Sequence, residues 1–104
     1  MFKINNIEWL IKFVQPWDDI FITPTGDITV GTCDNNTKII YLSTSLKNKE
    51  LKKVLCHEIV HAAMFSYDIR LDYEQEELLA NLIATYGEEI IKITNDMFKR
   101  LYLQ

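Results

Sequence analysis

The segment Val54-Leu55-Cys56-His57-Glu58-Ile59-Val60-His61-Ala62-Ala63 decides how this chain folds, and it contains the motif H-E-x-x-H. On a helix, residues four apart lie one above the other. His57 and His61 can therefore offer two imidazole nitrogens to one metal ion, with Glu58 beside them. The chain has 2 histidines, and both lie in this motif. The pattern predicts a divalent metal site on a helix.

Apolar residues surround the motif on most sides of the predicted helix. Two adjacent faces of it are apolar, formed by Leu55, Ile59 and Ala62 and by Cys56, Val60 and Ala63. Such a helix is typically buried, and burying two imidazoles and a carboxylate is costly unless they have a partner. A metal ion would be that partner. The alternative is a helix whose histidines pair with carboxylates or backbone carbonyls.

The length and composition indicate one small globular domain covering residues 1–104. The chain has 104 residues, of which 48% are hydrophobic and 25% charged, and these values are ordinary for a folded domain. Its formal net charge is -4, whereas binding to nucleic acid or to an anionic membrane requires clustered Lys and Arg. We therefore expect neither partner.

Three features favour a soluble cytoplasmic protein. Cys33 and Cys56 are too few for a disulfide framework, and we expect both to be reduced. Residues 1–6 lack the basic and apolar regions of a signal peptide. No apolar stretch approaches the length that crosses a membrane.

Patterns typical of strands fill the first half of the chain. A period of two predicts a strand with one buried face, formed by Ile7, Trp9, Ile11 and Phe13. Residues 2–4 are expected to form a short strand joined to it through Asn5 and Asn6. Residues 27–33 and 38–42 predict a hairpin around the turn residues 34–37.

The second strand of this hairpin leads into the helix of the motif. A strand in that position could run beside the cleft and pair with an extended peptide through its backbone. Tyr41 would then lie near the site. The alternative role for Tyr41 is that of a sheet aromatic packed on its neighbours.

Two helices are predicted in the second half of the chain. Asn48 is a plausible N-cap for a helix that carries the motif and ends near Phe65. Asp72 with Gln75 resembles a capping box that opens a second helix. Beyond Gly87 this helix either continues or kinks, because a helical period persists through Ile90, Ile93, Met97 and Leu101.

A catalytic zinc ion takes three protein ligands, so the two histidines need one further donor. The acidic candidates after the motif are Asp68, Asp72, Glu74, Glu76, Glu77, Glu88 and Glu89. We favour Glu77, because Asn81 follows one turn later and could accept the ring N–H of a ligating histidine. Glu76 points about 100° away and is the reserve candidate. The alternative is that these acids only favour the positive end of the helix dipole.

The chain resembles the gluzincin-type zinc metallopeptidases and, among them, small phage and prophage proteins of the ImmA/IrrE type. The resemblance rests on residues 57–61 and on Glu77-Leu78-Leu79-Ala80-Asn81, followed by residues 83–87. It implies an α+β fold in which a small antiparallel sheet of three or four strands packs on the motif helix. A long C-terminal helix would carry the third ligand. It also implies zinc held by His57, His61 and Glu77, with Glu58 as the base.

These observations lead to a functional hypothesis. We expect a zinc-dependent peptidase that cleaves a peptide bond in a specific protein partner, with Glu58 activating a water bound to zinc. An oxyanion donor would come from Tyr67, Tyr73 or Tyr86. One alternative is a catalytically silent, metal-stabilised binding module of phage or prophage origin. The other is a metal-free interaction protein. The sequence leaves the oligomeric state open.

Overall fold

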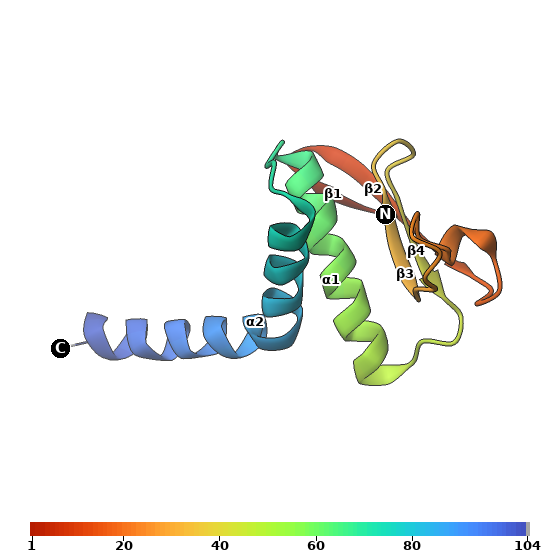
Figure 1. Cartoon of the computed structure of the whole chain (residues 1–104). Coiled ribbons are helices and arrows are strands. Elements are labelled where there is room, and N and C mark those ends of the chain that lie inside the picture. Colours follow the sequence, from red (N-terminus) through yellow and green to blue (C-terminus); the bar gives the residue numbers. More distant parts are fainter. Residues whose placement is uncertain (104) are drawn as a thin grey trace.

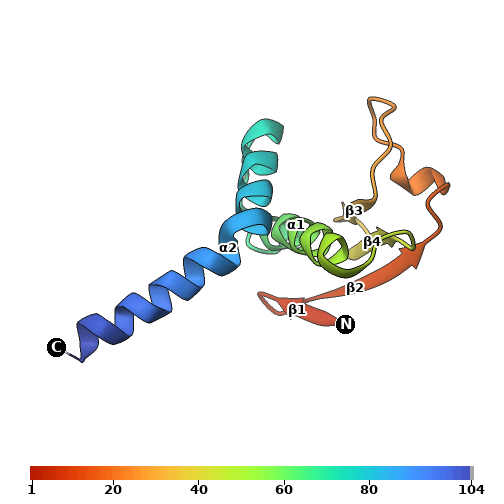
Figure 2. The same cartoon turned by 90° about the horizontal axis from the view of Figure 1, so that it is seen from below.

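The computed structural model describes residues 1–103, which form a four-stranded sheet and two long helices. The elements in chain order are β1 (Phe2–Ile4), β2 (Ile7–Val14), η1 (Asp19–Phe21), β3 (Gly31–Asp34), β4 (Ile39–Ser43), α1 (Asn48–Ser66) and α2 (Tyr73–Tyr102). Figures 1 and 2 show α1 lying between the sheet and the first half of α2. The predicted α+β architecture, with a sheet packed on the motif helix and a long C-terminal helix, is confirmed.

The sheet has the strand order β1-β2-β4-β3. Its two outer pairs, β1 with β2 and β3 with β4, are antiparallel hairpins, as the turn residues predict. The central pair is parallel, with Leu10 opposite Ile39 and Val14 opposite Ser43. The sheet is therefore mixed rather than antiparallel throughout. A parallel pair needs a long connection, and residues 15–38 supply it, but strand patterns do not reveal the direction of pairing.

The two hairpin turns are stabilised in different ways. Asn5 and Asn6 have positive φ values of 50° and 63°, as asparagine allows. At the second turn, Oδ1 of Asp34 accepts a hydrogen bond from the backbone N–H of Asn36 at 2.9 Å. The expected strand at residues 27–33 is shorter than predicted, because only its end from Gly31 pairs with β4.

The core lies between the sheet and α1. Its buried residues are Trp9, Ile40, Leu42, Leu46 and Ala62. The indole Nε1–H of Trp9 donates a hydrogen bond to Oγ of Ser66 at 2.8 Å, which ties β2 to the end of α1. Phe13 was expected on the same buried face but is 55% exposed, because the end of β2 extends beyond α1 (Figure 2).

The helix boundaries agree with the sequence patterns, with one correction. Asn48 is the first residue of α1 rather than its N-cap. Its φ is +54°, whereas an N-cap residue is extended, and the cap position falls on Lys47. The predicted capping box of Asp72 and Gln75 opens α2. Neither α1 nor α2 has an apolar window sufficient to cross a bilayer within residues 1–103.

The long helix α2 changes direction near its middle. Its first half packs along α1, and its second half projects away from the domain to the C-terminal end, as Figure 1 shows. The bend lies in the part that contains Gly87, while helical hydrogen bonding continues through it. Kinks at glycine are common, because this residue leaves the helix backbone less constrained.

Candidate metal centre

The two histidines of the motif converge because α1 stacks them one turn apart on a single face. Both rings are half-buried, and their Nε2 atoms lie 3.1 Å from each other. The rings meet edge to face, with a centroid separation of 4.9 Å. At this separation either one nitrogen donates its N–H to the other, or both lone pairs point to a shared cation.

Glu77 on α2 completes the group. One of its carboxylate oxygens lies 2.9 Å from Nε2 of His61, and the other lies 3.4 Å from Nε2 of His57. Ligand atoms of the three residues all lie within 4.8 Å of one another. A tetrahedral zinc ion bound at about 2.0–2.1 Å holds its ligands about 3.3 Å apart. The separations are close to that value, so these three residues could hold a metal ion of this size.

Glu76 lies on the other side of the His61 ring. Its carboxylate accepts a hydrogen bond from Nδ1–H of His61 at 2.5 Å. This contact fixes the proton on Nδ1 and leaves the lone pair of Nε2 directed towards Glu77. Glu76 therefore contacts the opposite nitrogen of His61 rather than lying with His57, His61 and Glu77, and it fixes the orientation of the His61 ring.

Asn81 does not fill the orienting role expected from its spacing. The side chain of Asn81 is exposed. The ring N–H of His61 is instead donated to Glu76. Packing of α2 explains the difference. Ala80 is fully buried against Val60 and Met64, which turns the next residue, Asn81, about 100° away from α1.

Glu58 lies beside the group and is 93% buried, with 7% of its surface exposed. The pKa of its carboxyl is raised to about 7, mainly by burial. The nearby His61 lowers this pKa and Glu77 raises it. The group can thus exchange a proton near neutral pH. Glycine at position 31 makes room for it, because a Cβ there would lie 3.2 Å from Oε2 of Glu58 and 2.7 Å from Cγ1 of Val54.

These residues line a cleft of about 230 Å³ between α1, α2 and β3. Its walls are formed by Thr23, Thr29, Gly31, Thr32, Cys33, His57, Glu58, His61, Phe65, Tyr73 and Glu77. Of the three tyrosines considered as oxyanion donors, Tyr73 lines this cleft, whereas Tyr67 and Tyr86 do not. Tyr41 also lies elsewhere, because β4 is an inner strand.

The residues that β3 contributes to the cleft were missed by the sequence analysis. A glycine inside a strand often marks a close approach, so Gly31 carried a signal that the motif overshadowed. Cys33 carried none. Burial and then the nearby Glu58 raise the pKa of its thiol to about 12, which keeps the thiol neutral. Both cysteines are free, as expected.

A comparison with protein families matches residues 19–97 to Peptidase_M78, described as the IrrE N-terminal-like domain. The chain belongs to this peptidase family. The matched residues include β3, α1 and most of α2, and hence every residue that lines the cleft. No curated protein and no solved structure gave a significant match.

Proposed function

We propose that this IrrE-like domain is a zinc-dependent peptidase that hydrolyses a peptide bond in a protein partner. The observation that carries the proposal is the convergence of His57, His61 and Glu77 next to the buried carboxyl of Glu58. Membership of a peptidase family supports the reaction class. Zinc is favoured over magnesium or calcium because two of the three donors are imidazole nitrogens.

Each residue of the site has a distinct task in this proposal. His57, His61 and Glu77 would hold zinc, which polarises a carbonyl and acidifies water when it is bound. Glu58 takes the proton of the attacking water and passes it to the leaving amine. Its burial suits this task, because loss of solvent raises the pKa of a carboxyl and makes the carboxylate a stronger base. Tyr73, at the rim, is the candidate donor to the oxyanion.

The shape of the cleft favours an extended peptide over a compact small molecule. Its volume of about 230 Å³ is below the ~300–1,000 Å³ typical of small-molecule pockets. β3 is an edge strand, and within residues 1–103 no strand pairs with its outer side. The backbone N–H of Ser43 donates to the carbonyl of Val30, so Val30 directs its backbone groups towards β4. In an antiparallel pair this direction alternates from residue to residue, so the N–H and C=O of Cys33 point away from β4, to the open edge of the sheet. A substrate strand could pair there.

Glu58→Gln tests the reaction. Zinc-loaded protein and the variant would be incubated with a cell lysate, and new protein termini would be mapped by mass spectrometry. We expect new termini with the wild-type protein and none with Glu58→Gln. The zinc content of the two proteins should be the same.

Two outcomes would count against the proposal. Equal cleavage by wild type and Glu58→Gln would show that Glu58 is not the base. Complete absence of new termini, combined with stable capture of one lysate protein by both forms, would favour the metal-stabilised binding module instead.

A further inference from the structure

The second half of α2 presents an apolar stripe to solvent. Its members recur at helical spacing and are Ile90, Ile93, Met97 and Leu101, exposed by 50%, 54%, 44% and 64%. This half projects from the domain in both views (Figures 1 and 2). Amphipathic helices gain most of their stability from packing their apolar face, so an uncovered stripe of this length indicates a missing partner.

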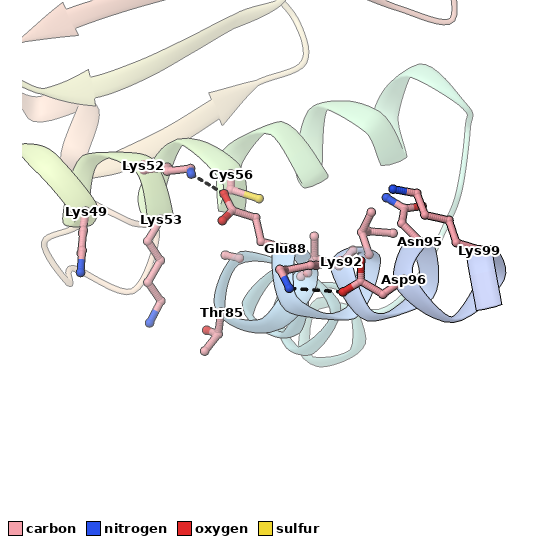
Figure 3. Close-up of a pocket in the computed structure, with 14 residues that line it drawn as sticks. Lys49, Lys52, Lys53, Cys56, Thr85, Glu88, Lys92, Asn95, Asp96 and Lys99 are labelled. Atoms are coloured by element: carbon pink, nitrogen blue, oxygen red, sulfur yellow. Dashed lines mark hydrogen bonds and ion pairs between the residues drawn. The ribbon is translucent and has the colours of Figure 1, made fainter.

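A different side of the same segment faces the parent domain, and it carries Glu88, Lys92, Asn95 and Asp96 together with Ile91. It lines a hollow of about 860 Å³ in the angle between α1 and α2. Figure 3 shows Glu88 paired with Lys52 of α1, and Lys92 paired with Asp96 along α2. No residue of the apolar stripe and no residue of the metal centre lines this hollow. The stripe is therefore directed away from the domain, and α1 does not cover it.

The two ends of the segment carry opposite charges, and between them Lys92 pairs with Asp96. Glu88 and Glu89 lie at its start, and Lys99 and Arg100 lie near its end. Glu89 lies four residues before Ile93, and Arg100 lies seven residues after it. At these spacings both residues lie on the same side of the helix as Ile93, along one edge of the stripe. A parallel pairing of two such helices would place like charges together. An antiparallel pairing would place each acid beside a base.

We propose that the stripe pairs with the same stripe of a second copy of this chain in an antiparallel arrangement. A two-fold axis near Asn95 would set Ile93 against the partner's Met97, and Ile90 against the partner's Leu101. The same axis sets Glu89 beside the partner's Arg100. Apolar spacing and charge are thus self-complementary about one point, which distinguishes a second copy from an unrelated partner.

Sedimentation equilibrium of the full chain tests the pairing. We expect a monomer–dimer equilibrium with a Kd of about 1–100 μM, as for a contact below the usual interface size. Met97→Glu should raise this Kd about a hundredfold or more, because it places a charge in the apolar contact of both copies. Asn95→Glu adds the same charge to the side that lines the hollow and should leave the Kd nearly unchanged. Circular dichroism confirms that both variants remain helical.

A wild-type chain that stays at its monomer mass of 12.2 kDa up to about 1 mM would overturn the proposal. So would equal effects of Met97→Glu and Asn95→Glu. These readouts do not depend on the metal centre, whose residues all precede the projecting half.

Charge reversal tests the antiparallel orientation. Glu89→Arg and Arg100→Glu should each raise the Kd by roughly threefold or more, because each places two like-charged pairs at the contact. A mixture of the two variants should recover wild-type affinity, since each copy then offers the opposite charge. Failure of the mixture to recover would exclude the orientation.

Discussion

The Nδ1 atom of His61 lies 2.5 Å from a carboxylate oxygen of Glu76, while Nε2 of the same ring faces Glu77. Two consecutive residues of α2 thus contact opposite edges of one imidazole. The angle of about 100° between neighbours on a helix allows this, because the ring lies between the two side chains. One acid orients the histidine, and the other lies with the donors.

Glu76→Gln should weaken zinc binding about 10–100-fold, because outer contacts of this kind fix the ring and raise its basicity. Competition with a chromogenic chelator measures the affinity. Glu74→Gln is the matched control, since Glu74 is an exposed acid in the first turn of the same helix. Equal losses in the two variants would mean that the contact with His61 has no specific role.

The buried Glu58 should make the metal-free protein less stable as pH rises. Its pKa of about 7 in the folded state exceeds the model value of 4.5. The folded state therefore holds the proton more tightly, and this contribution is complete below about pH 4.5 and lost as pH rises through 7. Wild type should lose about 2–3 kcal/mol from this group between pH 4 and pH 8.

Urea denaturation in the presence of a chelator measures this dependence. Glu58→Gln lacks the titrating group, so its free energy of unfolding should exceed that of wild type increasingly above pH 5. Parallel pH profiles of the two proteins would show that Glu58 does not titrate in this range.

Gly31→Ala should destabilise the protein by about 1–3 kcal/mol, because the new Cβ would overlap Cγ1 of Val54 in a packed interior. Truncating the partner relieves the overlap, so Gly31→Ala in a Val54→Ala background should cost clearly less. Thermal or urea denaturation of the four proteins gives the coupling energy. Additive effects would mean that the overlap with Val54 is not the source of the lost stability.

The contact between Trp9 and Ser66 should contribute to stability through a buried hydrogen bond. Trp9→Phe leaves the hydroxyl of Ser66 without its donor and should cost about 1–3 kcal/mol, including lost packing. Ser66→Ala in the Trp9→Phe background should add little, because the polar partner has already been removed. Denaturation of the single and double variants measures this difference.

Local patterns anticipated much of the fold and part of the site. Asn5 and Asn6 marked a turn, Asp72 and Gln75 marked a helix start, and the spacing of His57 and His61 marked a shared face. Each of these depends on residues close in sequence, where backbone geometry alone fixes the relationship.

The remaining features depend on how distant elements pack. The parallel pairing of β2 with β4 has no local signature. The rotation of α2 about its axis is set by Ala80 against Met64, and it decides that Glu76 rather than Asn81 contacts a histidine. Gly31 belongs to the site because β3 packs against α1, and the glycine inside a strand signals a close approach without naming the partner.

Zinc stoichiometry tests the central claim most directly. Untagged protein would be loaded with zinc, freed of excess metal and weighed intact by native mass spectrometry, beside Glu77→Gln and the control Glu74→Gln. The account predicts one zinc ion per chain in wild type and in the control, with loss of the ion in Glu77→Gln. A wild-type chain that retains no zinc, or a Glu77→Gln variant that retains it fully, would contradict the account.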